Sequence, residues 1–148
     1  MPIIDDTGPH DAAEPDYEGA ALLIGPDADP MTLTGRFGAL ELIAVAFPKS
    51  ADGRGFSLAR RLRHLGYSGR LRAKGWLLPD QYAYARACGF DDVAVDAAHF
   101  ARHGAEAWTH AATAPVAPPF RARQTPRAAA SRRGVRRRPR APRDAAPD

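Results

Sequence analysis

The stretch "LELIAVAFPKSADGRGFSLARRLRHLGYSGRLRAKG" (residues 40–75) decides the fold class of this chain. Its first eight residues are almost wholly apolar, which is typical of a parallel strand covered on both faces. Three leucines then recur at helical spacing, in a helix that we expect Ser57 to cap and Gly66 to end. Residues 69–75 alternate apolar and basic side chains, like a strand with one polar face. The stretch therefore predicts a strand–helix–strand unit with parallel strands.

The same alternation continues on both sides of this unit. Residues 19–25 form a short apolar run, and Asp29 followed by a proline is typical of a helix start. Downstream, we expect Asp80 and Asp96 to cap two more helices, on either side of a fourth strand at residues 90–95. About four strand–helix units predict an α/β domain with a small parallel sheet, either open or resembling half of a barrel.

The chain divides into three parts of different composition. Residues 1–18 are acidic and contain three prolines, so we expect a flexible arm. Residues 19–112 hold the α/β domain. Residues 113–148 are rich in Ala, Pro and Arg, with ten arginines against two aspartates, which predicts a disordered basic tail. The high pI of the sequence, about 9.7, therefore belongs to the tail and not to the domain.

The basic tail allows two interpretations. It could bind nucleic acid through phosphate contacts without sequence specificity. The same composition is also what GC-rich coding DNA gives in a shifted reading frame. We therefore prefer a passive or artefactual tail, and expect a nucleic-acid partner only if the tail is genuine.

The segment "DGRGFS" (residues 52–57) is the first candidate site. It joins the carboxyl end of a strand to a helix, where ligands of parallel sheets bind and where free N–H groups attract anions. Arg54 adds a guanidinium group suited to oxyanions, and we expect the amides near Gly53, Gly55 and Ser57 to assist it. The segment is neither a P-loop nor a dinucleotide fingerprint, so a plain turn remains the alternative.

Further polar residues near this segment extend the candidate site. Arg72 and Lys74 lie on one face of the next strand, where we expect them to open towards the same loop, and Lys49 would complete a basic cluster. Asp52 and Asp80 lie on the two corresponding loops. They are candidate acid/base groups, with helix capping or pairing with the arginines as the alternative.

Other residues with reactive or metal-binding side chains fit structural roles better. The single cysteine, Cys88, fits a reducing compartment and a buried structural thiol. His99, His103 and His110 include an i, i+4 pair, but without a third ligand we expect a solvated helix face and no metal site. We expect Tyr82, Tyr84 and Trp76 in the core or at its rim, in preference to a role as stacking groups. No secretion signal and no apolar run long enough for a membrane helix is visible, which indicates a cytoplasmic protein without a membrane partner.

Several motifs in residues 47–91 resemble the signature region of a bacterial family of domains of unknown function. Members of that family are labelled as oxidoreductases involved in sulfite reduction. The matching elements are Asp-Gly-Arg, Ser-x-Ala-x-x-Leu-Arg, Gly-x-Leu-Arg-Ala-x-Gly, Asp-Gln and Gly-Phe-Asp, at residues 52–54, 57–63, 69–75, 80–81 and 89–91.

The resemblance implies an association with sulfite or nitrite reductase and with sulfur assimilation. It implies no defined reaction and no cofactor, so enzymatic activity stays open. We expect an accessory protein or oxidoreductase of sulfite reduction that binds a small anion at the strand ends. The alternatives are a non-enzymatic module that docks on the reductase, and nucleic-acid binding through the tail.

Overall fold

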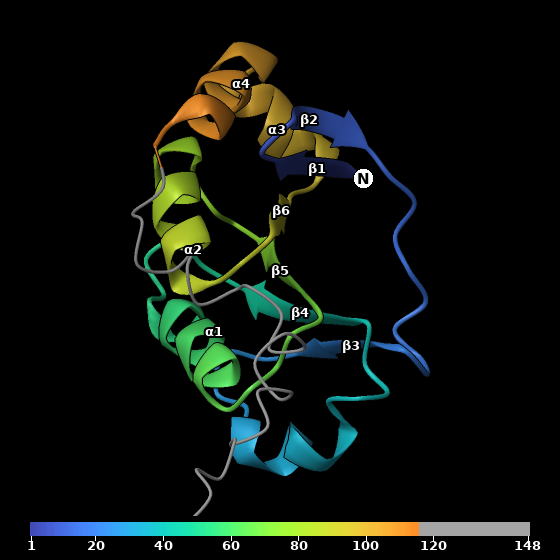
Figure 1. Cartoon of the computed structure of the whole chain (residues 1–148). Helices are drawn as coiled ribbons and strands as arrows, with labels where there is room; N and C mark the ends of the chain where they lie inside the picture. Colours follow the sequence, from blue (N-terminus) through green and yellow to red (C-terminus); the bar gives the residue numbers. More distant parts are fainter. Residues whose placement is uncertain (116–148) are drawn as a thin grey trace, which may run out of the picture.

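A computed structural model gives the fold of residues 1–115, the part of the chain that the structure describes (Figure 1). Six strands form one sheet in the order β2-β1-β6-β5-β4-β3. Four of them are parallel to one another: β3 (Ala21–Ile24), β4 (Leu42–Phe47), β5 (Arg70–Gly75) and β6 (Asp92–Ala94). Two antiparallel strands continue the sheet beyond β6: β1 (Pro2–Asp5) and β2 (Gly8–Asp11).

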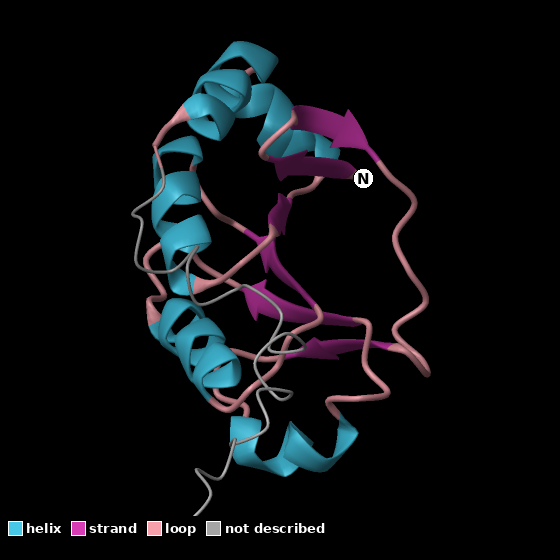
Figure 2. Cartoon of the chain, in the orientation of Figure 1, coloured by secondary structure: helices cyan, strands magenta, loops and turns pink. Residues whose placement is uncertain are grey.

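Helices α1, α2 and α4 lie on one side of this sheet (Figures 1 and 2). Each parallel connection leads to the neighbouring strand in the same direction, and right-handed crossovers then place their helices on the same face. The small parallel sheet that the sequence predicts is thus confirmed, as four strands of a larger, mixed sheet. Among the described residues, no helix is long and apolar enough to cross a membrane. The helices are η1 (Pro30–Arg36), α1 (Arg54–His64), η2 (Pro79–Gln81), α2 (Tyr82–Cys88), α3 (Ala97–His103) and α4 (Ala105–Thr113).

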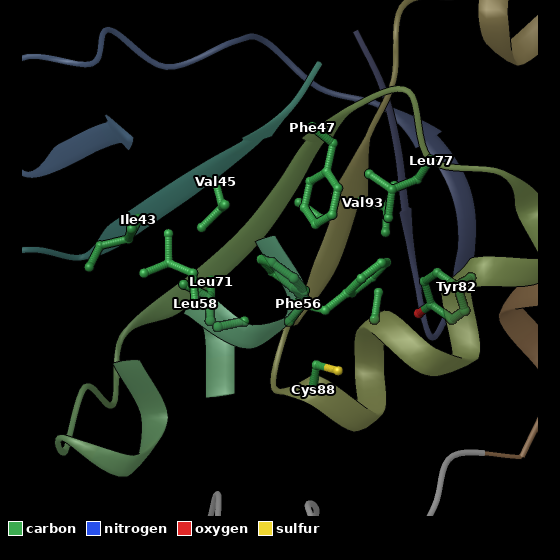
Figure 3. Packing of buried hydrophobic residues seen from close by; sticks show 14 of the residues in the cluster. Ile43, Val45, Phe47, Phe56, Leu58, Leu71, Leu77, Tyr82, Cys88 and Val93 are labelled. Atoms are coloured by element: carbon green, nitrogen blue, oxygen red, sulfur yellow. The ribbon is translucent and has the colours of Figure 1, made fainter. Parts of the chain in front are cut away.

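The hydrophobic core lies between the sheet and these helices (Figure 3). Alternate residues of β4, namely Ile43, Val45 and Phe47, face the helices because successive strand side chains point to opposite faces. Leu58 and Leu62 of α1 pack against them at helical spacing. The apolar patterns that predict the strand and the helix therefore form one continuous core.

Part of the acidic segment 1–18, for which the composition indicates a flexible arm, is regular structure. Residues 2–11 form a β-hairpin, and Ile3 and Ile4 are almost completely buried beside β6. The turn is closed by the Asp5 carboxylate, which accepts hydrogen bonds from the amide and hydroxyl of Thr7, and by Gly8 at φ 108°. Two adjacent isoleucines are enough to add a strand, because one faces the helices and the other the opposite face of the sheet.

The helix ends confirm part of the sequence analysis. Asp29 and Asp96 cap their helices, each accepting a hydrogen bond from a backbone N–H of the first turn. Ser57 does not cap α1, which begins three residues earlier at Arg54. The last predicted helix is two helices, because Gly104 adopts φ 83° and separates α3 from α4.

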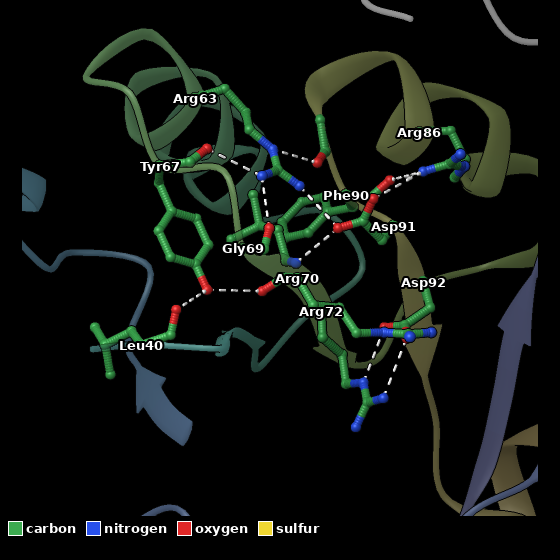
Figure 4. A network of polar contacts seen from close by, with 12 residues as sticks. Leu40, Arg63, Tyr67, Gly69, Arg70, Arg72, Arg86, Phe90, Asp91 and Asp92 are labelled. Carbon is green, nitrogen blue, oxygen red and sulfur yellow. Dashed lines mark hydrogen bonds and ion pairs between the residues drawn. The ribbon is translucent and has the colours of Figure 1, made fainter. Parts of the chain in front are cut away.

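The face of the sheet away from the helices holds a buried ion pair (Figure 4). Asp92 is fully buried and accepts hydrogen bonds from Arg72 through Nε (2.8 Å) and Nη2 (3.1 Å). Arg70 Nε donates to the same carboxylate at 2.7 Å, although the Arg70 side chain is 48% exposed. The segment between β2 and β3 crosses this face, because these strands are the two edges of the sheet (Figure 2).

We expect Asp92→Ala to lower the free energy of unfolding by about 3–5 kcal/mol, because Arg72 would remain as a buried charge without its partner. Arg70→Ala removes the exposed partner and is expected to cost no more than about 1 kcal/mol. Urea unfolding followed by circular dichroism measures both. Equal losses in the two variants would contradict the role of Arg72 as the essential partner.

Candidate functional site

An open groove of about 410 Å³ lies at the carboxyl ends of three neighbouring parallel strands. Its walls are the segment that follows β4, the segment that follows β5, and helix α3, which follows β6. Because β5 lies between β4 and β6, its segment lies in the middle. We call this site the Trp76 groove; it is lined by Pro48, Lys49, Ser50, Trp76, Leu78, His99, Arg102 and His103.

The lining of the Trp76 groove is basic. Lys49 and Arg102 contribute two cationic side chains, His99 and His103 contribute two imidazoles, and none of the lining residues is acidic. Lys49 and Arg102 take part in none of the ion pairs formed within residues 1–115, in contrast to Arg54, which binds Asp52. A cleft lined by charge of one sign raises the local concentration of ions of the opposite sign. The groove therefore favours anions.

His99 is the buried side chain of the groove, with only 5% of its surface exposed. Its Nε2 lies 2.6 Å from the carbonyl oxygen of Leu77. Because a carbonyl only accepts, Nε2 carries the proton and donates it. The other ring nitrogen, Nδ1, is buried without a hydrogen-bond partner among the described residues. It accepts a hydrogen bond when the ring is neutral and donates one when the ring is protonated.

Aromatic rings surround His99. The rings of Trp76 and His103 pack edge-on against it, with centroids at 5.1 Å and 4.8 Å. The fully buried Trp108 lies at 6.2 Å, and its Nε1 is also buried without a partner in the described part of the chain. Buried polar atoms are normally hydrogen-bonded, and unpaired ones are often found at functional sites. Two of them beside one basic groove mark this region as the candidate site.

Gln81 holds two walls of the groove together. Its Nε2 donates to the carbonyl oxygen of Ser50 at 2.8 Å, and its Oε1 accepts from the amide of Leu78 at 2.8 Å. The segments after β4 and β5 are thus joined by one side chain. Asp80, which the sequence predicts to cap the helix that is α2, lies instead within η2 and is exposed. The neighbouring residue, Gln81, accepts the hydrogen bond from the amide of Leu78.

The backbone of Trp76 is fixed by the end of β4. The amide of Trp76 donates to the carbonyl oxygen of Phe47 at 3.0 Å. Gly75 adopts φ +137°, and a Cβ atom at this position would lie 2.2 Å from the same oxygen. Only glycine permits this conformation and this approach. The position of Trp76 in the groove is therefore determined by the strand pairing.

A second, smaller groove of about 250 Å³ contains part of the predicted site. Arg54 forms a bidentate ion pair there with Asp52, with Nε–Oδ1 and Nη2–Oδ2 distances of 2.9 Å and 2.7 Å. These hydrogen bonds lower the pKa of Asp52 to about 2. The charge of Arg54 is therefore already paired. We call this site the Arg54 groove; it is lined by Pro26, Asp27, Ala28, Arg54, Ser57, Leu58 and Arg61.

The structure does not bring Arg72 and Lys74 to Arg54. Arg72 binds Asp92 in the middle of the sheet, and Lys74 forms an ion pair with Glu14, both on the face away from the helices. The sequence pattern correctly places Arg72 and Lys74 on one face of β5. That face does not lead to the loops at the strand ends, because strand side chains project perpendicular to the sheet. Of the predicted basic residues, only Lys49 lines the Trp76 groove.

The two glycines of "DGRGFS" have different roles. Gly53 precedes α1 and faces open space, so nothing near it requires the absence of a side chain. Gly55 lies in the first turn of α1, and a Cβ atom there would lie 2.4 Å from Cζ of Phe47. Gly55 therefore allows α1 to approach the end of β4, which is a packing role.

Gly55→Ala is expected to lower the free energy of unfolding by about 1–3 kcal/mol, because the added methyl group overpacks the Phe47 ring. The matched change Gly53→Ala is expected to shift it by less than about 1 kcal/mol in either direction. Thermal or urea unfolding of both variants tests this difference. A neutral Gly55→Ala variant would show that the packing around Phe47 relaxes freely.

Sequence analysis does not identify several residues of the groove as site residues. The spacing of the histidines indicates a solvated helix face, whereas His99 is buried. Trp76 and residues 99–103 also follow the carboxyl ends of strands, so the rule that selects residues 52–57 could have found them.

Cys88 lies in the core, and burial raises the pKa of its thiol, as expected of a structural cysteine. Within residues 1–115, no three His, Cys, Asp or Glu side chains are grouped to hold a metal ion.

The fold and the groove define a small α/β protein with helices along one face of a mostly parallel sheet and a basic groove at the strand ends. Residues 21–114 match the family model described as a bacterial protein of unknown function (DUF934), and the chain belongs to this family. The match begins at β3 and ends after α4, so it covers the parallel part of the sheet and every wall of the Trp76 groove. Comparison with the curated proteins and with the solved structures found no match.

Proposed function

We propose that this protein binds a small oxyanion in the Trp76 groove and acts as a cytoplasmic accessory protein of sulfite reduction. The observation that supports the binding proposal is the composition of the groove, with two cationic side chains, two imidazoles and no acid. Sulfite and sulfate are oxyanions that guanidinium, ammonium and imidazolium groups recognise through charge-assisted hydrogen bonds. The assignment to sulfite reduction rests on the resemblance of residues 47–91.

The charges of the groove come from separate elements of the fold. Lys49 follows β4, whereas Arg102 and His103 belong to α3, which follows β6. An anion between them would be contacted from both sides, with His99 at the buried end of the imidazole pair. Gln81 holds the Lys49 segment in place through Ser50. The lining of the groove thus comes from several elements of the fold and not from one local motif.

Isothermal titration calorimetry with sulfite and sulfate, at constant ionic strength, tests the binding proposal. We expect Lys49→Ala and Arg102→Ala each to weaken binding about tenfold, the effect of removing one charge-assisted contact. Both side chains lie on the surface of the groove, so the fold should be retained, which circular dichroism checks.

Arg54→Ala is the matched control, because it removes one arginine from the neighbouring groove, where Asp52 already binds it. We expect it to weaken oxyanion binding much less than the two groove variants do, because the Asp52 carboxylate that it releases acts on Lys49 only through space. The basic sequence of residues 113–148 is the same in all variants and cannot produce a difference between them. The proposal is wrong if neither groove variant weakens binding, or if only Arg54→Ala does.

A second candidate function is a non-enzymatic module that docks on a sulfite or nitrite reductase. The observation that favours it is Trp76, which is 45% exposed, because tryptophan is enriched at the centres of protein interfaces. Titration with the purified sulfite reductase of the same host separates the two functions. Docking predicts binding that Trp76→Ala abolishes and that saturating sulfate does not reduce.

A further inference from the structure

We infer that the ligand of the Trp76 groove carries a planar aromatic ring next to its anionic group, as a mononucleotide does. This inference rests on the proposed function and concerns the same groove. It is based on the size of the groove, on the exposed indole in its middle, and on the cationic side chains on either side of that indole.

The groove is larger than an inorganic oxyanion requires. Its volume of about 410 Å³ falls in the range of roughly 300–1,000 Å³ that is typical of sites for small organic molecules. One water molecule takes about 30 Å³ in the liquid, so a tetrahedral oxyanion of a few heavy atoms would leave most of the groove unused. The remaining space is lined by Trp76, Leu78 and Pro48, which suit an uncharged part of a ligand.

Trp76 provides a prepared surface for a ring. Its side chain is 45% exposed, although the next residue, Leu77, is fully buried. The indole packs edge-on against His99 at an interplanar angle of 72°, and its backbone is held by Phe47. An aromatic side chain that is fixed in place loses little conformational freedom when another ring stacks on it. Such stacking is how proteins bind bases without reading their sequence.

The arrangement of the strands places the cations beside this ring. The Trp76 segment follows the middle strand β5, Lys49 follows the strand on one side, and Arg102 lies on α3 after the strand on the other. A ligand stacked on Trp76 would thus have a cationic side chain within the groove on either side for a phosphate or sulfate group. A nucleotide combines both features, a heteroaromatic ring and an attached anion.

The experiment compares adenosine monophosphate, inorganic phosphate and adenosine as ligands of the full-length chain by calorimetry. We expect the nucleotide to bind on the order of tenfold or more tightly than phosphate, as one stacked base allows. Trp76→Leu should reduce the affinity for the nucleotide to that for phosphate and leave phosphate binding unchanged. Trp76→Phe keeps an aromatic surface and should retain most of the gain.

Tryptophan fluorescence gives a second measurement. Trp108 is fully buried, so quenching by the stacked base should come from Trp76 and disappear in Trp76→Leu. Sulfate should compete with the nucleotide, because both would use Lys49 and Arg102. As a control for charge, Arg36→Ala removes an exposed arginine from η1 and should change neither affinity.

The outcomes separate this inference from the proposed function. If the nucleotide binds no more tightly than phosphate, or if Trp76→Phe behaves like Trp76→Leu, stacking on Trp76 is excluded. The oxyanion site then still stands, provided that Lys49→Ala and Arg102→Ala weaken phosphate binding. If all groove variants bind both ligands like the wild type, the inference and the proposed function fail together.

Discussion

The close packing around Phe47 is the constraint on which the rest of the structure depends. A Cβ atom at residue 55 would lie only 2.4 Å from the Phe47 ring, so α1 can approach β4 this closely because residue 55 is glycine. A Cβ atom at residue 75 would lie only 2.2 Å from the carbonyl oxygen of Phe47. The same oxygen accepts the hydrogen bond from the amide of Trp76. One residue at the end of β4 thus positions the following helix and the neighbouring strand end. The shape of the Trp76 groove therefore depends on these contacts.

Most residues that carry the family resemblance stabilise the fold. Arg63 donates to the carbonyl oxygens of Tyr67, Gly69 and Gly89 and to the carboxylate of Asp91, which ties α1 to the segments that enter β5 and β6 (Figure 4). This network lies at the amino ends of the strands, and the groove lies at their carboxyl ends. These contacts of the signature elements stabilise the fold, whereas the residues that line the Trp76 groove lie outside the five matching elements.

Local patterns in the sequence predict the parallel strands and most helices, because periodicity and caps depend on residues near one another in the chain. Contacts between distant residues are not predictable in this way. Nothing in the sequence near Arg72 indicates that Asp92, twenty positions later, takes up its charge. Likewise, Ile3 and Ile4 look insufficient for a strand until β6 offers them an edge to pair with. The expected convergence of Arg54 and Arg72 is absent for the same reason, because each arginine binds a carboxylate that local patterns do not assign to it.

The basic character of the Trp76 groove follows from arrangement more than from composition. The segments at this edge of the sheet also carry acids, but Asp52 is bound by Arg54, and Asp96 accepts the hydrogen bond that caps α3. These two carboxylates are therefore used locally, a third acid, Asp80, is exposed in η2, and none of the three lines the groove. An anion that reaches Lys49 and Arg102 displaces no ion-pair partner described in the structure, whereas an anion at Arg54 must compete with a bidentate carboxylate. Because such competition lowers affinity, the groove after β4, β5 and β6 is the better candidate for an anion site, even though the segment after β4 contains the more conspicuous motif.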